Sequence, residues 1–434
     1  MSDDRAGRGA PDGTGPRPVT AGTDETPLVE VRNLERYFHE DDSLLDRLLG
    51  AEPTAVRAVD GVSFDVREGE TLGLVGESGC GKSTAGETVL HLQEPTGGSV
   101  VFDGETLGER SDLTPFRRRA GIVFQDPFSS LDPRMTVGET VRQPLEINDV
   151  GTPEERRDRA AELIERVGLS AEQLQRYPHE FSGGQRQRIG IARALALDPE
   201  FVVLDEPTSA LDVSVQAQIL NLLDDLQDEL GLTYLFISHD LSVIRHICDR
   251  VAVMYLGELV EIAPADALFE EPRHPYTRAL LESVPRIDTG ERDRELEPLA
   301  GDVPSPRDPP SGCRFRTRCP KVIPPADCDL ERPGYRAVMD LRRRVAEGSL
   351  PVEKVRSESG GDAVAVAERL YDRVVDGALP ADHERYVREA LVDVAEGRPE
   401  EAAAALRDRY ESVCETDHPS GARATCHLPN SNVQ

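Results

Sequence analysis

One stretch of this sequence decides the fold expected of the rest: Gly76-Glu77-Ser78-Gly79-Cys80-Gly81-Lys82-Ser83-Thr84. Its first eight residues fit the pattern G-x-x-x-x-G-K-[ST], after an apolar run ending at Val75 and before a helical pattern. The glycines let successive backbone N–H groups turn inward as an anion-binding nest, and the helix start adds its positive dipole end. We therefore expect a phosphate-binding loop, in which Lys82 reaches the β- and γ-phosphates of a nucleotide and the Ser83 hydroxyl binds Mg²⁺. A chance glycine-rich turn is the alternative.

Around this loop, apolar and β-branched runs alternate with helical segments from about residue 27 to residue 285. The runs cover residues 70–75, 120–124, 201–204, 234–237 and 251–255. Nearly continuous apolar runs are typical of buried parallel strands, so the alternation predicts an α/β domain with a parallel sheet. A mostly helical subdomain is expected as an insertion at about residues 126–190. In it, Thr152 and Glu155 predict a capping box for a helix that runs to Val167 and stops at Gly168.

Two adjacent carboxylates follow the run at residues 201–204. Asp205 ends an apolar strand, where it can hold Mg²⁺ through water, and Glu206 comes next at the strand's carboxyl edge, where the γ-phosphate would lie. Glu206 is therefore the expected general base that polarises the attacking water, a role that typically contributes about 10²–10⁴-fold in rate. An acid pair at the N-terminus of a helix is the alternative, because a proline follows Glu206.

The composition limits the class of protein. The chain has 434 residues, enough for two or more folded units, and a net charge of −31 from 81 acidic and 50 basic residues. This charge argues against nucleic acid as a ligand, since phosphate backbones need clustered Lys and Arg. Because the acidic residues are spread along the chain, we interpret them as adaptation to the salt-rich cytosol of a halophile, where ions screen the repulsion. An ordinary acidic protein is the alternative.

Targeting signals and disulfides are not expected. No run of about 18 apolar residues is present, so the sequence predicts no membrane-spanning helix. Residues 1–26 lack the apolar core of a secretion signal and are expected to form a flexible tail. The seven Cys are an odd number, which argues against a disulfide framework in an intracellular chain.

A second motif introduces a family resemblance. The stretch Phe181-Ser182-Gly183-Gly184-Gln185 resembles the LSGGQ signature of ABC ATPases, with Phe in the first position. A Ser hydroxyl, Gly N–H groups and a helix start again form an anion site. The resemblance implies a RecA-like P-loop core that binds ATP and Mg²⁺. It also implies that the signature contacts ATP held by the opposite subunit, so that hydrolysis needs two such domains arranged head to tail.

Other positions are similar to the same family. Gln125 resembles the Q-loop glutamine, which touches Mg²⁺ and the attacking water. The stretch Ser209-Ala210-Leu211-Asp212 resembles the D-loop at the dimer interface, and His239 resembles the switch histidine that contacts the γ-phosphate. Phe38 is similar to the aromatic residue that stacks on adenine, with Tyr37 as the alternative.

Further stretches, at residues 128–135, 177–180 and 274–281, resemble the oligopeptide and dipeptide importer branch. The insert at residues 40–56 and the His-Glu pair before the signature resemble the second of its two paired ATPases. The implied function is ATP hydrolysis that energises import of dipeptides or oligopeptides. Import of nickel or oligosaccharides, and a soluble non-transport ABC ATPase, are the alternatives. The implied partners are a paralogous ATPase subunit or a second copy, two transmembrane permeases and an extracellular substrate-binding protein, at the cytoplasmic face of the membrane.

Cysteines mark the region after residue 285. Cys313 and Cys319 have five residues between them, and Cys328 follows after eight more. Their surroundings resemble the C-terminal extension of the oligopeptide branch, where a fourth Cys stands before His-Leu, as Cys426 does here. That extension can hold an iron–sulfur cluster, so the resemblance implies that these four thiols bind [4Fe–4S]. Zinc or unligated thiols are the alternatives, and Cys414 is the rival of Cys328.

The expected organisation has five parts. The tail at residues 1–26 precedes a nucleotide-binding domain at residues 27–285. The cysteine-containing extension covers residues 286–340, and an acidic helical insert without an assigned chemical role covers residues 341–412. Residues 413–434 carry the last Cys.

Overall fold

The computed structural model describes residues 26–39, 55–108, 112–209, 211–283, 301–375, 377–419 and 424–428. The tail expected at residues 1–26 and the insert expected at residues 40–56 lie outside the described residues, apart from residues 26, 55 and 56. Within the part of the chain that is described, no helix combines the length and the apolar character needed to cross a bilayer.

Six strands form the central sheet in the order β10-β9-β3-β8-β7-β6. Their bounds are β3 (Thr71–Val75), β6 (Ala120–Val123), β7 (Phe201–Asp205), β8 (Thr233–Ser238), β9 (Arg250–Tyr255) and β10 (Glu258–Pro264). All but β10 run parallel, so the predicted parallel α/β sheet is confirmed. Every residue of β3, β7 and β8 is buried, which is why the sequence shows continuous apolar runs there.

The structure adds a second, antiparallel sheet that the sequence patterns do not predict. It contains β1 (Val29–His39), β2 (Ala55–Val66), β4 (Gly97–Phe102) and β5 (Glu105–Leu107), in the order β2-β1-β4-β5. Register shifts interrupt the pairing of β1 with β2, for example between Val31 and Leu34, so the two-residue alternation is lost. Leu34 of this sheet and Leu74 of the central sheet belong to one hydrophobic core.

Helices cover the sheets and form the inserted subdomain. Their bounds are α2 (Lys82–Val89), α3 (Thr114–Arg119), α4 (Val137–Ile147), α5 (Pro153–Arg166), η1 (Ala171–Gln175), η2 (Pro178–Glu180), α6 (Gly183–Ala194), α7 (Val213–Leu230), α8 (Leu241–Ile247), α9 (Ala265–Glu270) and α10 (Pro275–Glu282). The capping box of α5 is confirmed: the Glu155 N–H donates to Thr152 Oγ1 at 3.3 Å, and the Thr152 N–H donates to Glu155 Oε2 at 2.7 Å. The helix ends at Arg166, one residue earlier than expected, and Gly168 follows at φ 78°.

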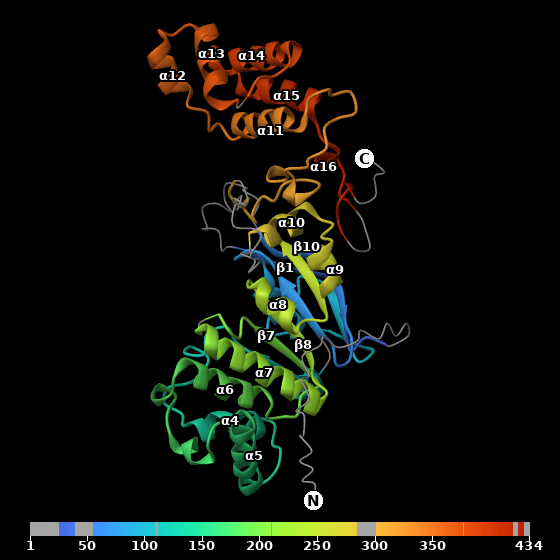
Figure 1. Ribbon diagram of the computed structural model, residues 1–434, viewed down its shortest axis with the longest axis vertical. Coiled ribbons are helices and arrows are strands. Elements are labelled where there is room, and N and C mark those ends of the chain that lie inside the picture. Colours follow the sequence, from blue (N-terminus) through green and yellow to red (C-terminus); the bar gives the residue numbers. More distant parts are fainter. Residues whose placement is uncertain are drawn as a thin grey trace, which may run out of the picture.

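The C-terminal region contains η3 (Arg314–Thr317), α11 (Arg332–Ala346), α12 (Val352–Ser359), α13 (Ala363–Val374), α14 (Ala381–Ala395), α15 (Pro399–Tyr410) and α16 (Val413–Thr416). Helices α11 to α15 form a lobe at one end of the molecule, beyond α10 and β10, and the subdomain of α4, α5 and α6 lies at the other end (Figure 1). Tyr335, Leu341, Leu391 and Tyr410 are fully buried within this lobe. The boundary expected between residues 340 and 341 falls inside α11, so the insert is a packed unit that starts earlier, and not a simple solvated helical stretch.

Candidate active site

The loop between β3 and α2 has a backbone that only glycine fits at its key positions. Gly79 and Gly81 have φ angles of 78° and 108°, which side-chain-bearing residues rarely adopt. A Cβ atom at Gly81 would also lie 2.0 Å from the carbonyl oxygen of Ala58. Positive φ angles of this kind are what a loop needs to form an anion-binding nest before α2.

Lys82 and Ser83, the first residues of α2, lie where the sequence predicts them. The Lys82 side chain is buried, and its Nζ donates to the carbonyl oxygens of Gly76 at 2.9 Å and Glu77 at 3.1 Å. Ser83 Oγ donates to Asp205 Oδ1 at 3.0 Å. A hydroxyl and a carboxylate side by side are oxygen ligands of the kind that Mg²⁺ uses next to nucleotide phosphates.

The environment of Asp205 changes its ionisation. Burial raises the pKa of Asp205 to about 6, and the negative charges of Glu206 and Glu87 act in the same direction. The hydrogen bond from Ser83 opposes this rise. A cation beside Asp205 would favour the carboxylate form and lower this pKa.

Gln125, Glu206 and His239 meet at the carboxyl edge of the central sheet. They follow β6, β7 and β8, which are neighbouring parallel strands, so their side chains start from the same edge. Gln125 Nε2 donates to Glu206 Oε2 at 2.8 Å, and His239 Nδ1 lies 3.0 Å from Glu206 Oε1. Glu206 is held at φ 45° by its own N–H, which donates to the Ile237 carbonyl at 2.9 Å. The strained backbone of Glu206 thus places its carboxylate between two polar side chains, where it can bind and deprotonate a water molecule.

The signature residues form a separate anion site at the start of α6. Ser182 Oγ accepts from the Gln185 N–H at 3.4 Å, and Gln185 Oε1 accepts from the Ser182 N–H at 3.0 Å. A Cβ atom at Gly184 would lie 2.3 Å from Val215, so the helix start packs closely on α7. Among the described residues, no hydrogen bond or ion pair joins Ser182 or Gly183 to the phosphate loop.

The D-loop residues lie near this second site. Asp212 caps α7, accepting from the Val215 N–H at 3.0 Å. The next side chain, Val213, is 82% exposed, which is unusual for a valine in a packed domain. Ser209 and Leu211 are described, whereas Ala210 lies outside the described residues.

The two aromatic candidates for adenine stacking differ in their contacts. The Tyr37 hydroxyl donates to Asp60, a carboxylate that also pairs with Arg314. Phe38 is half-buried, and the Arg36 guanidinium lies 4.6 Å from its ring centroid. An arginine also lies over Tyr37, with the Arg57 guanidinium 6.0 Å from the ring centroid, so the two rings differ mainly in the hydrogen bond that holds Tyr37 to Asp60.

The phosphate loop has two further contacts that sequence reasoning missed. Arg318 donates to both carboxylate oxygens of Glu77, at 2.7 and 3.0 Å. The Tyr276 hydroxyl accepts from the Glu77 N–H at 2.9 Å. Arg318 lies 241 positions from Glu77, so no local pattern in the sequence could have indicated this pair.

Four cysteines converge in the extension, and one of them differs from the predicted set. Cys313, Cys319, Cys414 and Cys426 line one cavity of about 10 Å³, enough for about one water molecule. Cys328, which the sequence predicts in this set, does not line the cavity, whereas its rival Cys414 does. The reason is the insert, which returns the chain to the extension at α16, where the Cys313 N–H donates to the Cys414 carbonyl at 2.8 Å.

The pKa values and the number of these cysteine thiols bear on which metal group they could bind. Burial raises the pKa of Cys313 to about 12, and the neighbouring Cys414 and Cys426 act in the same direction. Among the described residues, no group of three or more His, Cys, Asp and Glu surrounds a single metal-ion position. Four thiols around one cavity match in number the donor set of a four-iron cluster and that of a tetrahedral zinc ion.

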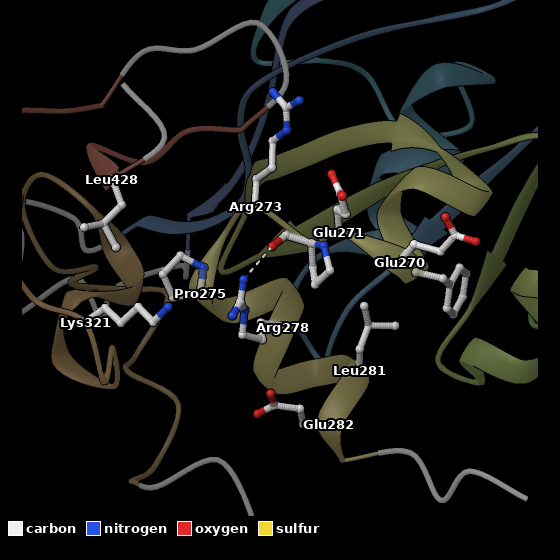
Figure 2. Close-up of a pocket in the computed structure, with 11 residues that line it drawn as sticks. Glu270, Glu271, Arg273, Pro275, Arg278, Leu281, Glu282, Lys321 and Leu428 are labelled. Carbon is white, nitrogen blue, oxygen red and sulfur yellow. Dashed lines mark hydrogen bonds between the residues drawn. The ribbon is translucent and has the colours of Figure 1, made fainter. Parts of the chain in front are cut away.

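A larger pocket lies beside α10, away from the nucleotide motifs. Its volume is about 780 Å³, and Figure 2 shows Arg278 pointing to the Pro272 carbonyl, to which it donates at 3.2 Å. The lining residues are Phe269, Glu270, Glu271, Pro272, Arg273, Pro275, Arg278, Leu281, Glu282, Lys321 and Leu428. None of the phosphate-loop, Asp205 or Glu206 residues lines it, so it is not the candidate active site.

Comparisons with known proteins agree with this geometry. Family models match residues 59–209 (ABC transporter), residues 260–325 (oligopeptide/dipeptide transporter, C-terminal region) and residues 332–426 (a domain of unknown function, DUF8228). A putative peptide import ATP-binding protein of Brucella ovis is 54% identical over 301 residues, which are 69% of this chain and 91% of the relative. The oligopeptide transport ATP-binding protein AppF of Bacillus subtilis is 52% identical over 310 residues, which are 70% of this chain and 93% of the relative. The solved ATP-binding cassette MJ0796, bound to ADP and Pi, covers 55% of this chain and 99% of that chain, with a TM-score of 0.48 and 31% identity.

Proposed function

The chain belongs to the ABC transporter family, in its branch of peptide import ATP-binding proteins, and on that premise we propose that it hydrolyses ATP to drive the import of dipeptides or oligopeptides. The observation that carries this proposal is the meeting of Gln125, Glu206 and His239 on the sheet edge that also bears the phosphate loop. Because the relatives are named for peptides, import of nickel or oligosaccharides and a non-transport role are not favoured.

Each residue of the site has a distinct part in the reaction. Lys82 would leave the two loop carbonyls to which it now donates and neutralise phosphate charge, while Ser83 and Asp205 would hold Mg²⁺. Bound Mg²⁺ supplies charge neutralisation on the phosphate oxygens. Glu206 accepts the proton of the attacking water, and Gln125 and His239 keep its carboxylate oriented.

Two nucleotide-binding domains are needed for a complete site. The exposure of Ser182, in the serine–glycine turn, and of Val213 supports this part of the proposal, since both side chains are open to solvent in one chain. The second domain is a paralogous ATPase or another copy of this chain. Two permease subunits and an external binding protein complete the importer, with the ATPases on the cytoplasmic side of the membrane.

The test of the proposed reaction is Glu206→Gln. The variant keeps the size of the side chain and one acceptor oxygen for Gln125 and removes the base, so we expect ATP binding to persist and turnover to fall by about 10²–10⁴-fold. Glu229→Gln, an exposed change on α7, is the matched control and should leave turnover unchanged. Normal ATP hydrolysis by the Glu206 variant, measured with the permease and partner subunits present, would remove Glu206 from the mechanism.

The second part of the proposal concerns the cysteines. An iron–sulfur cluster would be held by Cys313, Cys319, Cys414 and Cys426. It would link the extension covalently to the C-terminal segment that follows the lobe. The convergence of the four thiols on one cavity and the Lys321 N–H, which donates to Cys319 Sγ at 3.3 Å, support this assignment, and a cluster requires that cavity to widen beyond its present volume of about 10 Å³. Iron and sulfide are measured in anaerobically purified protein; zinc in place of iron, or neither metal, would contradict the cluster.

A further inference from the structure

The phosphate loop contains an acidic residue, and this creates an electrostatic problem. Glu77 is the second residue of a loop whose expected ligand, the triphosphate of ATP, is itself strongly negative. Like charges within a few ångströms repel each other, and the repulsion is strong where protein excludes water. A loop with an unpaired carboxylate would therefore bind nucleotide less tightly than the same loop without it.

Arg318, which is distant from Glu77 in the sequence, pairs with the Glu77 carboxylate. Its two terminal nitrogens each donate to one oxygen of Glu77, at 2.7 and 3.0 Å, which is the bidentate geometry of the strongest charge-assisted pairs. The Arg318 side chain is only 5% exposed, and the Glu77 side chain is 26% exposed. Water therefore screens this pair less than it screens a surface ion pair.

The segment that carries Arg318 is anchored on the same domain. Arg314, four residues earlier, donates to the Leu256 carbonyl and pairs with Asp60, and its Nε lies 2.8 Å from Glu258. The Arg318 guanidinium also lies 5.9 Å from the centroid of the Tyr255 ring. These contacts hold the segment that carries Arg318, and the Arg318 side chain itself, against the nucleotide-binding domain.

The loop is held at Glu77 by its backbone as well. The Glu77 N–H donates to the Tyr276 hydroxyl at 2.9 Å, and Tyr276 is fully buried in α10. Tyr276 and Phe315 form an aromatic contact with ring centroids 5.3 Å apart, so the residue that holds the loop backbone packs on the residue next to Arg314. Tyr276 therefore holds the main chain of Glu77, and Arg318 holds its side chain.

We propose that Arg318 is a positioning residue for ATP binding, which neutralises the Glu77 carboxylate and thereby makes the cysteine-containing extension an integral part of the nucleotide site. This inference rests on the proposed function, because it concerns the same phosphate loop. It goes further in assigning to the extension a direct electrostatic contribution to nucleotide affinity, in addition to any metal that the cysteines hold.

The experiment measures the dissociation constant of MgATP by equilibrium titration for the full chain and five variants. Arg318→Ala should raise it by about 10- to 100-fold, the scale of one lost hydrogen-bonded charge pair. Glu77→Gln removes the carboxylate that Arg318 neutralises, so it is the reference against which the double variant is compared. The double variant should return to the value of Glu77→Gln, and Arg318→Lys should lie between wild type and Arg318→Ala, since Lys keeps the charge without the fork.

The matched control is Arg316→Ala, in the same segment, whose guanidinium donates to Ser311 and not to Glu77. It should bind MgATP as the wild type does. Equal affinity of Arg318→Ala and wild type would overturn this inference alone. A loss in Arg318→Ala that Glu77→Gln fails to rescue would also overturn it, because that is the result of a merely structural role. Failure of the wild-type chain to bind MgATP would overturn the proposed function and this inference with it.

Discussion

Replacement of Asp205 by asparagine should stabilise the nucleotide-free protein while it damages the magnesium site. Burial raises the pKa of Asp205 from an ordinary value of 3.8 to about 6. The folded state therefore binds a proton more tightly than the unfolded chain does. Below pH 3.8 Asp205 is protonated in both states, so it does not lower the free energy of unfolding. That free energy falls as the pH rises from 3.8 to about 6.

The size of the effect follows from the same two values. The gap between them corresponds to about 3 kcal/mol of unfolding free energy above pH 7. Asparagine keeps an acceptor for the Ser83 hydroxyl and has no charge to bury. We expect Asp205→Asn to exceed the wild type by about 1.5 kcal/mol at pH 5 and by about 3 kcal/mol at pH 8.

Urea unfolding of both proteins, followed by circular dichroism because the chain has no Trp, measures this difference. Asp225→Asn, an exposed change on α7, is the control and should stay within about 0.5 kcal/mol of the wild type at both pH values. With saturating MgATP the order should reverse, since ligand binding stabilises only the state that holds it. A difference that is the same at pH 5 and pH 8, or an asparagine variant less stable than the wild type at pH 8, would refute the reasoning.

Three further outcomes are expected. Lys82→Ala should weaken MgATP binding, measured by direct titration, because it removes the cation nearest to the loop carbonyls; unchanged affinity would contradict the loop assignment. Thr152→Ala should lower the free energy of unfolding by about 1 kcal/mol through loss of the capping box of α5, measured by urea unfolding, and no change would contradict the role of that box. Cys414→Ser should reduce the iron content of anaerobically purified protein while Cys328→Ser should not; the opposite pattern would restore the set predicted from the sequence.

Much of the nucleotide site was accessible from the sequence because its motifs are local. The turn at Gly81 needs a φ angle that glycine adopts freely, and Lys82 and Ser83 follow it directly in the chain. Asp205 and Glu206 are adjacent at the end of one strand. The convergence of Gln125, Glu206 and His239 needed only one more step, since the carboxyl ends of neighbouring parallel strands share one edge of a sheet.

Other features depended on contacts between distant parts of the chain. The bidentate pair of Arg318 with Glu77 joins residues 241 positions apart, and the exchange of Cys328 for Cys414 depends on where the C-terminal lobe returns the chain. The antiparallel sheet was hidden because its register shifts break the two-residue alternation. Local backbone geometry is written in a few contiguous residues, so the sequence by itself determined the parallel core and the phosphate loop. Long-range pairs are selected by packing in three dimensions, so only the tertiary structure decided which arginine faces the loop and which cysteines meet.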